Sequence, residues 1–582
     1  MRIRHLWIDN FRGIESLDWA IPNDQRLIAL IGPGDTGKST ILEAIYLLLS
    51  DRWMIPFNDV DFHGIDLSSP IRIRALLTQL PPGLMKDTTL GLWLSGADQA
   101  GGPTQDPEDG TEPALLVELQ VDSALEPIWA VIRLDGQRQP LSAAMRRQFS
   151  TFRVDDRADV QLRWSRTSAL GRLSSASGAD REALAHASRA AQDALANREN
   201  APLAQLVTEV QHRSNAIGAS HFQGLRAGLD TSRSATGASL ALYEGAVPLT
   251  SYGLGTRRLT SLAAQQLAAS DRAIALVDEL ESGLEPHRAV RLLEFLKEDR
   301  GYAQVFVTTH SPVVVEQAQL SNLATVQNQD GRCVVTHLGG AFGVAQRIQR
   351  ARPSSLLARR VIVVEGKTEH GLILECLQTW DDDNALLGLP TSAGKGAAIQ
   401  DAGGGSEVAP RVQTLIQLGY SAAGLLDNDD KSVERAVTRA VNSGALIVRW
   451  QAGHCTEQEV CSGLEAEDLT EFLHLGVELR GSESTVIHEL NQSGSYNDAF
   501  TLDVRSWIGS DLTIEDARRW VAATAIDGKW FKTVDSAREL AKWILKKRAQ
   551  SSLSTTMERL DQIRKFVYET PEAEASRDDS DA

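Results

Sequence analysis

The residues of this chain best suited to chemistry begin with the run Gly-Pro-Gly-Asp-Thr-Gly-Lys-Ser at 32–39. The run follows an apolar stretch, 26–31, that predicts a strand, and it opens a stretch, 38–49, that predicts a helix. Glycines in such a loop let successive N–H groups face an anion at the start of the helix, a lysine adds positive charge, and a hydroxyl serves Mg²⁺. The sequence therefore predicts an ATP site. Its expected ligands are Gly32, Gly34, Gly37, Lys38, Ser39 and Thr40.

A carboxylate for the same metal ion is expected from a second apolar stretch. Residues 273–278 predict a buried strand, and Asp278 at its end would lie near the Mg²⁺ that Ser39 binds. Glu279 is then placed to polarise an attacking water, and Glu281 competes for that role.

Two further features are placed to contact the γ-phosphate. Ser251 and Gly253, with Gly255 after them, predict exposed N–H groups at the start of a helix, which suits capture of a γ-phosphate across a dimer interface. His310 follows the predicted strand 303–309 and would sense the same phosphate, although a single histidine is more often structural.

A separate set of acids lies in the second half of the chain. Residues 361–364 predict a strand that leads into Glu365, with Glu369 in the helix after it, and about sixty residues later another apolar stretch ends at Asp427 and Asp429. Acids at the ends of two parallel, neighbouring strands converge. Ligands that are all oxygen favour Mg²⁺ or Mn²⁺ over zinc, and two such ions can activate water for phosphodiester cleavage.

The first set of motifs, together with Ile-Asp-Asn-Phe-Arg-Gly-Ile at 8–14, resembles an ABC/SMC-type ATPase head over residues 1 to about 345. The resemblance implies a head divided by an insertion. Because this insertion is short and lacks sustained heptads, it is expected to be a helical dimerisation region. Asp59 and Asp61 fall near the place of the family's Q-loop, but no glutamine is present there. The resemblance also implies at least a homodimer, with ATP between two heads.

The second set resembles the TOPRIM fold, in which Glu-Gly after the first strand precedes Asp-x-Asp after a later one. A head followed by such a domain resembles the OLD (overcoming lysogenization defect) nuclease family, and the length and domain order are similar to its Gabija anti-phage branch. The resemblance implies a further acid some thirty residues after Asp-x-Asp and a late lysine near the scissile phosphate. For the acid, Glu457 is preferred to Glu459, and Glu465 is a third candidate. For the lysine, Lys532 is preferred to Lys529.

Three side chains near these motifs are candidates for contacts with DNA. Arg411 is a candidate to hold the phosphate backbone. Trp530 and Phe531 could stack on bases, but aromatic residues of this kind more often belong to a core.

Composition limits the possible classes of protein. Hydrophobic residues make up 42% and charged residues 23%, which is typical of a globular protein without membrane spans. The four cysteines are scattered and no CxxC pair accompanies His454, so neither disulfides nor zinc is expected. A cytoplasmic location is therefore expected.

The net charge of −18 argues against a nucleic-acid partner. Residues 518–565, however, carry twelve Lys and Arg against five Asp and Glu, and this basic stretch is either a DNA footprint or a solvated helical surface.

The fold class expected from these patterns is α/β: an ABC/SMC-type P-loop head with a helical insertion, then a TOPRIM α/β domain and a helical C-terminal region. The expected divisions are 1–164 for the first half of the head, 165–245 for the insertion, 246–350 for the second half, 351–470 for the TOPRIM domain, 471–568 for the helical region and 569–582 for a disordered acidic tail.

The predicted activity is ATP-regulated, metal-dependent DNA cleavage in anti-phage defence, with a helicase as a possible partner. The alternative is an SMC-like ATP-dependent DNA clamp with a non-catalytic TOPRIM platform. A topoisomerase is disfavoured because only Tyr496 and Tyr568 follow the acids, neither in an evident winged-helix context.

Overall fold

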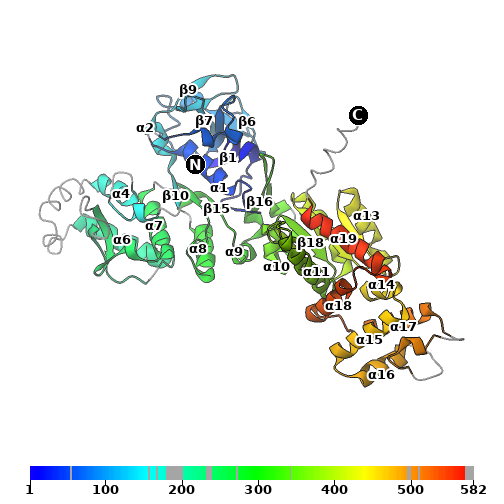
Figure 1. Ribbon diagram of the computed structural model, residues 1–582. Helices are drawn as coiled ribbons and strands as arrows, with labels where there is room; N and C mark the ends of the chain where they lie inside the picture. Colours follow the sequence, from blue (N-terminus) through cyan, green and yellow to red (C-terminus); the bar gives the residue numbers. More distant parts are fainter. Residues whose placement is uncertain are drawn as a thin grey trace. The chain divides into compact units, whose positions relative to one another are not determined.

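The computed structural model describes residues 1–52, 55–154, 158–164, 168–177, 201–219, 221–230, 239–269, 273–299, 301–340, 343–493, 500–508 and 512–569. The chain forms two compact units, Met1–Gly340 and Ala341–Ala582, and many of their elements are labelled in Figure 1. Of the expected acidic tail, only Glu569 is among the described residues.

The first unit is built on one large sheet, and its central strands are parallel. In spatial order they are β10 (Thr151–Val154), β14 (Ala273–Val277), β15 (Tyr302–Thr308), β3 (Leu27–Ile31) and β16 (Leu323–Gln329). β14, β15 and β3 are buried along their whole lengths, which explains why they read as unbroken apolar runs. Their carboxyl ends therefore meet at one edge, where the predicted ATP ligands follow them.

The sheet continues through mainly antiparallel strands. They are β17 (Arg332–His337), β2 (Ile14–Ala20), β1 (Arg2–Phe11), β4 (Ile71–Thr78), β7 (Glu112–Val121), β5 (Ser95–Ala97), β6 (Pro103–Thr104), β8 (Pro127–Ile132) and β9 (Arg138–Pro140). The Gly-, Pro- and Asp-rich stretch 96–113 thus contains short strands. β5 pairs with the long strand β7, a tertiary contact that its Gly- and Pro-rich sequence does not reveal.

Helices accompany the sheet of the first unit. They are α1 (Lys38–Leu49), α2 (Ala143–Arg146), α7 (Leu254–Ala268), α8 (Pro286–Glu298) and α9 (Pro312–Gln317). The bounds of α1 match the predicted helix. It turns Ile41, Leu42 and Ile45 into the same hydrophobic core as Ile28 and Leu30 of β3, so burial of one apolar face fixes the helix on the sheet.

The predicted insertion is mixed rather than helical. Its described helices are α4 (Ala169–Ser177) and α6 (Ala201–Ala216), and both pack against α7, as does α3 (Ala158–Gln161), which precedes the insertion. β11 (Leu225–Asp230) and β12 (Ser239–Glu244) pair antiparallel, and β13 (Val247–Pro248) joins them. The expected helices are present in α4 and α6, but residues 225–230 and 239–244 form strands instead, because their polar, Gly- and Ser-rich sequence hides the pairing that makes them a sheet.

The second unit has a four-stranded parallel sheet in the order β19 (Ala397–Asp401), β18 (Arg360–Val364), β20 (Ser421–Leu426) and β21 (Leu446–Arg449). The helices associated with it are α10 (Val344–Ala351), α11 (Lys367–Leu386), α12 (Gly405–Gln417), α13 (Glu434–Asn442) and α14 (Thr456–Ser462). α10 packs on α12, and residues 353–357 form a short 3₁₀ turn beside β19.

The rest of the second unit is helical, as predicted. Its helices are α15 (Ala466–Arg480), α16 (Glu483–Ser493), α17 (Ile514–Asp527), α18 (Val534–Lys546) and α19 (Ser554–Tyr568). α15, α16 and α17 pack together (Figure 1), whereas α18 packs along α11. Thr513 and Thr533 cap the starts of α17 and α18 with their hydroxyls.

The predicted fold class is confirmed: an α/β P-loop head precedes a second α/β sheet and a helical C-terminal region. Among the described residues, no helix is both long and apolar enough for a membrane crossing.

Candidate nucleotide site and carboxylate site

The phosphate-binding loop lies between β3 and α1, and glycine is required at its start. Gly32 has φ of 134°, and a Cβ there would lie 2.6 Å from the carbonyl oxygen of Val326. Gly37 has φ of 94° and directly precedes α1. These conformations are strained for any residue with a side chain, so the glycines of the motif are fixed by backbone geometry.

The Lys38 side chain is buried inside this loop. Its ammonium donates to the carbonyl oxygens of Gly32, at 3.1 Å, and Pro33, and it lies 3.3 Å from the Thr36 hydroxyl. The positive charge therefore lies within the loop that would bind the phosphates.

Asp278 follows β14 and lies beside Ser39, as expected for a site that shares one metal ion. The Ser39 hydroxyl donates to Oδ1 of Asp278 at 2.9 Å, and the Thr308 hydroxyl donates to the same oxygen at 2.7 Å. Arg153 from β10 donates to Oδ2 at 2.9 Å. Both oxygens of Asp278 are thus oriented by neighbouring strands.

The two candidate water-polarising acids have different surroundings. Glu281 accepts the His310 N–H at 2.6 Å and the Thr309 hydroxyl at 2.7 Å, so it holds the turn after β15. Glu279 is exposed, with φ of 45°, and its N–H donates to Thr308. This geometry favours Glu279 for contact with water. Burial and the Lys38 ammonium lower the pKa of His310, which keeps its ring neutral.

The loop before α7 carries the other candidate γ-phosphate contacts. Ser251 and Gly253 are exposed there. Gly255 lies so close to the loop after β14 that a Cβ would be 2.1 Å from the Gly283 oxygen. Arg258, one turn further on, donates to the carbonyl oxygens of residues 278, 279 and 282. The start of α7 is therefore tied to the Asp278 loop.

Of the two acids near the expected Q-loop, Asp61 has a structural role, whereas Asp59 is exposed. Asp61 is mostly buried, pairs with Arg12 at 2.9 Å and accepts the Asn58 N–H at 3.0 Å. It closes a short turn, 59–61, so it does not supply the missing glutamine function.

The second site lies at the carboxyl ends of β19, β18 and β20, around a cavity of about 370 Å³. The residues that line it are Glu365, Gly366, Lys367, Thr368, Glu369, Asp401, Gly403, Gly404, Asp427 and Lys532. Glu365 follows β18 and accepts the Asp427 N–H at 3.1 Å, a contact that links the ends of the two neighbouring strands.

Glu369 and Asp427 are joined by the Thr456 hydroxyl. Thr456 Oγ1 lies 2.9 Å from Oε1 of Glu369 and 3.2 Å from Oδ1 of Asp427, and it accepts the indole N–H of Trp450. Burial, followed by the charges of Glu369 and Glu365, raises the pKa of Asp427 to about 8. Burial also raises the pKa of Glu369. The carboxyl groups of this site therefore crowd together more negative charge than the protein's own hydrogen-bond donors neutralise.

Of the three later acids, Glu457 is the one that approaches Lys532. It is fully buried, and its Oε1 lies 3.3 Å from the Lys532 ammonium. Desolvation acts to lower the pKa of Lys532, but the carboxylates of Glu457 and Glu369 outweigh it and raise the pKa. Glu459 instead accepts from His454 at 2.9 Å, and Glu465 is exposed and pairs with Arg518.

Lys532 reaches the cavity because α18 lies unusually close to α11. A Cβ on Gly371 would be 2.3 Å from the Val534 oxygen, and the Thr368 hydroxyl donates to the Phe531 carbonyl at 2.9 Å. Trp530 and Phe531 are buried in the core, as the core interpretation of these aromatics predicted. Lys529 is exposed and does not line the cavity.

Two other predicted residues, Arg411 and Asp429, do not line the cavity. Arg411 is buried and donates to the Asp401 carbonyl at 3.0 Å, so the expectation that it holds a phosphate was wrong; its guanidinium closes the loop before α12. Asp429 is exposed beside Asp427, and its neighbour Asp430 caps the turn at Ser432.

Sequence reasoning missed four polar residues of these sites. Thr308 and Arg153 gain their positions from strand order, and Thr456 gains its position at the start of α14. Neither their types nor their spacing marks them. Asp401 ends β19 opposite Val364. It directly precedes Ala-Gly-Gly-Gly, and an acid at the end of a strand before a glycine turn could have been found by the reasoning applied to Glu365.

Within the described parts of the chain, no three His, Cys, Asp or Glu side chains are arranged as ligands of one metal ion. The acids of the second site direct oxygens at protein donors instead, at the Asp427 N–H, the Gly366 N–H and the Thr456 hydroxyl.

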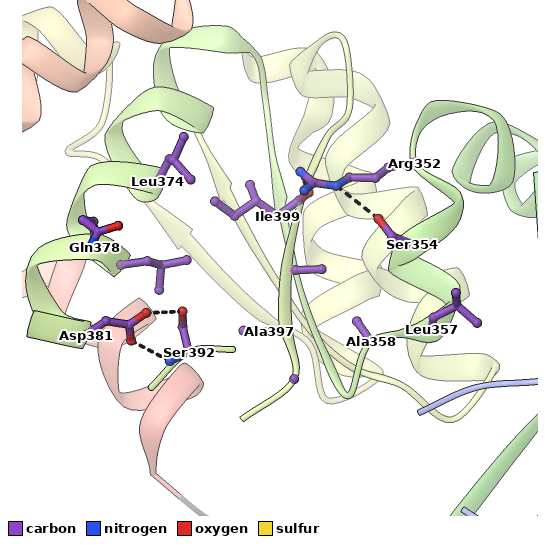
Figure 2. A pocket seen from close by; sticks show the side chains of 13 residues that line it. Arg352, Ser354, Leu357, Ala358, Leu374, Gln378, Asp381, Ser392, Ala397 and Ile399 are labelled. Carbon is purple, nitrogen blue, oxygen red and sulfur yellow. Dashed lines mark hydrogen bonds between the residues drawn. The ribbon is translucent and has the colours of Figure 1, made fainter. Parts of the chain in front are cut away.

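A second cavity of the same unit, of about 430 Å³, lies between α11, β19 and the turn at 353–357 (Figure 2). Its polar groups are already paired. Asp381 accepts the Ser392 N–H and hydroxyl, and Arg352 donates to Ser354 and to the Ile399 carbonyl.

The basic stretch 518–565 is largely neutralised within the fold. Seven of its cations form ion pairs: Arg518, Arg519, Lys532, Arg538, Lys542, Lys547 and Arg548. This favours the interpretation as a helical surface over a dedicated DNA footprint.

Comparison with known families defines the class of the first unit. Residues 1–78 match the AAA ATPase domain, and residues 131–316 match an AAA domain described as a putative AbiEii toxin of a type IV toxin–antitoxin system. Together with the loop at 32–39, these matches identify an ATPase domain that binds ATP.

One similar protein is Endonuclease GajA of Bacillus cereus (strain VD045), which is 28% identical over 163 residues. The match spans 27% of this chain and 27% of that protein, about a quarter of each.

Similar solved structures are heads of SMC proteins. An Smc head bound to the C-terminal winged-helix domain of ScpA has a TM-score of 0.39 at 15% identity, and the SMC head domain from Thermotoga maritima has 0.30 at 15%. An Smc head with an extended coiled coil, bound to the C-terminal domain of ScpA derived from Pyrococcus furiosus, has 0.37 at 13%. They cover 59%, 58% and 60% of this chain and 99% of their own.

Proposed function

We propose that the protein is an ATP-regulated, divalent-metal-dependent DNA endonuclease whose cleavage site is the carboxylate cluster of the second unit. The observation that carries the proposal is the convergence of Glu365, Glu369 and Asp427 on one cavity, with Lys532 at its rim and Glu457 behind the lysine. The parallel sheet and the positions of its acids are those expected of a TOPRIM domain of the OLD family.

The residues fit Mg²⁺ or Mn²⁺ by their chemistry. The acidic side chains of the site are carboxylates, which are hard oxygen ligands. The raised pKa of Asp427 reflects burial beside other negatively charged acids, and a divalent cation would balance that charge. Glu365, Asp427, Asp429 and Glu457 would hold it, with Glu369 beside them. The ion supplies Lewis acidity, which lowers the pKa of water and neutralises charge on a phosphodiester.

The chain's own groups would orient and neutralise the substrate. Lys532 is kept protonated by Glu457 and offers a positive charge to a phosphate at the rim of the cavity. Thr456 fixes the side chains of Glu369 and Asp427 from the protein side. Both contacts act before the bond breaks, by placing the phosphate against the acids.

In the first unit, ATP would bind through Lys38 and the loop N–H groups, with Mg²⁺ between Ser39 and Asp278. The 2.9 Å contact between these two oxygen ligands suits an ion at this position. Thr40, next along α1, would assist at the phosphates. Glu279 would polarise water, while Ser251 and Gly253 of a second copy and His310 would contact the γ-phosphate, so at least a homodimer is expected, formed through 165–245.

The biological role that fits is Gabija-like anti-phage defence in the cytoplasm, with a helicase as a candidate partner. The partial similarity to Endonuclease GajA supports this role. The alternative, an SMC-like DNA clamp with a non-catalytic platform, is less favoured because the carboxylate cluster and its lysine are complete.

The test separates the two sites. Purified protein is incubated with supercoiled plasmid and Mn²⁺, and nucleotide binding is measured in parallel with a fluorescent ATP analogue. We expect Glu365→Ala/Asp427→Ala to lose cleavage but keep ATP binding, and Lys38→Ala to lose ATP binding. Asp430→Asn, an exposed acid three residues from Asp427, should cleave like wild type. Cleavage that survives the double substitution would refute the proposal.

A further inference from the structure

Arg153 lies between two acids of the nucleotide site. It is the second-to-last residue of β10, pairs with Glu43 of α1, and donates to Oδ2 of Asp278 at 2.9 Å. All three side chains are largely buried, at 15%, 20% and 16% exposure for Arg153, Glu43 and Asp278. The guanidinium is thus a buried cation shared by two carboxylates.

This cation opposes a metal ion at the same carboxylate. Ser39 and Thr308 donate to Oδ1 of Asp278, and Arg153 covers Oδ2. A positive charge at this distance, in a site with little water, weakens the attraction of Asp278 for a divalent cation beside Ser39. Glu43 draws the same guanidinium in the opposite direction, toward α1.

The backbone connects Arg153 to the insertion. The N–H of Asp278 donates to the Val154 carbonyl at 3.1 Å, so the end of β10 is tied to the end of β14. The next described element along the chain, α3, packs on α7. The N–H of Leu242, on β12 of the insertion, donates to the carbonyl oxygen of Leu162, just after α3, at 3.3 Å. A shift of the insertion would therefore be transmitted to the guanidinium.

We propose that Arg153 is a positioning residue that sets the magnesium affinity of the nucleotide site. The position of β10 and the insertion determines whether its guanidinium lies nearer to Glu43 or nearer to Asp278, and therefore how strongly its charge acts on Asp278. The proposal rests on the proposed binding of ATP with magnesium in the first unit. It gives the insertion a path to the nucleotide site that does not pass through the γ-phosphate contacts.

The test measures magnesium affinity without turnover. A fluorescent ADP analogue is bound to the full chain, and Mg²⁺ is titrated to find its half-saturating concentration. Arg153→Gln is expected to lower that concentration at least about threefold, because an opposing charge is removed. Glu43→Gln is expected to raise it, because the guanidinium then belongs to Asp278 alone. Arg153→Lys should stay close to wild type.

Arg74→Gln is the matched control. It breaks an ion pair of the same length, 2.9 Å to Asp9, on β4 of the same unit, and should leave the magnesium affinity unchanged. Unchanged or weaker magnesium binding in Arg153→Gln would overturn the inference and indicate a purely structural pair. If Arg153→Gln does not fold, Glu43→Gln decides, and unchanged or tighter magnesium binding overturns the inference. Failure of wild type to bind the ADP analogue at all would instead refute the proposed ATP site.

Discussion

Replacing Asp427 by asparagine should stabilise the protein while it removes a group needed for cleavage. The side chain keeps its shape, so the contact with Thr456 is preserved, but the substitution removes a carboxyl that must either hold a proton or add its charge to a crowded acidic site. Burial and the neighbouring acids raise the pKa of Asp427 from 3.8 to about 8. Such a shift corresponds to at most about 6 kcal/mol. Sharing of the proton with Glu369 and local relaxation reduce this, so we expect a gain of about 1–3 kcal/mol.

The sign of the pH dependence follows from the raised pKa. The folded state holds a proton on Asp427 that the unfolded chain releases near pH 4, so folding is increasingly disfavoured between about pH 4 and pH 8. The gain from Asp427→Asn should be absent at pH 4, grow to pH 8 and stay constant above it.

The assay is chemical unfolding in EDTA at pH 4.5, 7 and 9, read by circular dichroism. Asp430→Asn is the control, because hydrogen bonds from Ser432 lower the pKa of Asp430; this variant should lose stability above pH 4. A variant Asp427→Asn that is less stable than wild type at pH 9 would refute the description of Asp427 as a strained, uncompensated charge.

Three further substitutions test particular contacts. Lys38→Ala should abolish binding of a fluorescent ATP analogue while leaving the circular dichroism spectrum unchanged, and retained binding would count against the loop as the ATP site. Gly32→Ala should lower the free energy of unfolding by at least about 1–3 kcal/mol, because its φ is strained and its Cβ would meet the Val326 oxygen; a neutral effect would contradict the loop geometry. Lys532→Met should reduce plasmid cleavage and, by leaving Glu457 buried without its cation, destabilise by about 1–3 kcal/mol, less than for a fully buried pair because the lysine is half exposed. A double substitution with Glu457→Gln should recover part of that stability, and strict additivity would argue against the pair.

The fold was predictable where local patterns agree with burial. The helix 38–49 and the strands before Ser39, Asp278 and Glu365 follow from apolar runs that are buried on the sheet. The strands of the insertion were not predicted, because β11 and β12 become a sheet only by pairing with each other, and this pairing is not visible in the local pattern of either strand.

The residues of the two sites also divide into those that could be predicted from the sequence and those that could not. Glu365 and Asp427 could be found because each ends a buried strand. The choice among Glu457, Glu459 and Glu465 could not be made from sequence, because it depends on how α14 is rotated against the sheet. Arg153 is 125 residues from Asp278 and becomes its neighbour only through the order of strands β10 and β14.

The most direct test of the carboxylate cluster as a nuclease is the rate at which supercoiled plasmid is cut in Mn²⁺ by wild type and by Asp427→Asn, measured on the same preparations used for unfolding. We predict that the variant is at least as stable as wild type and cuts at least about 100-fold more slowly, as expected when a ligand or orienting group of a metal site is lost. A variant that is well folded and cuts at the wild-type rate would contradict the central claim.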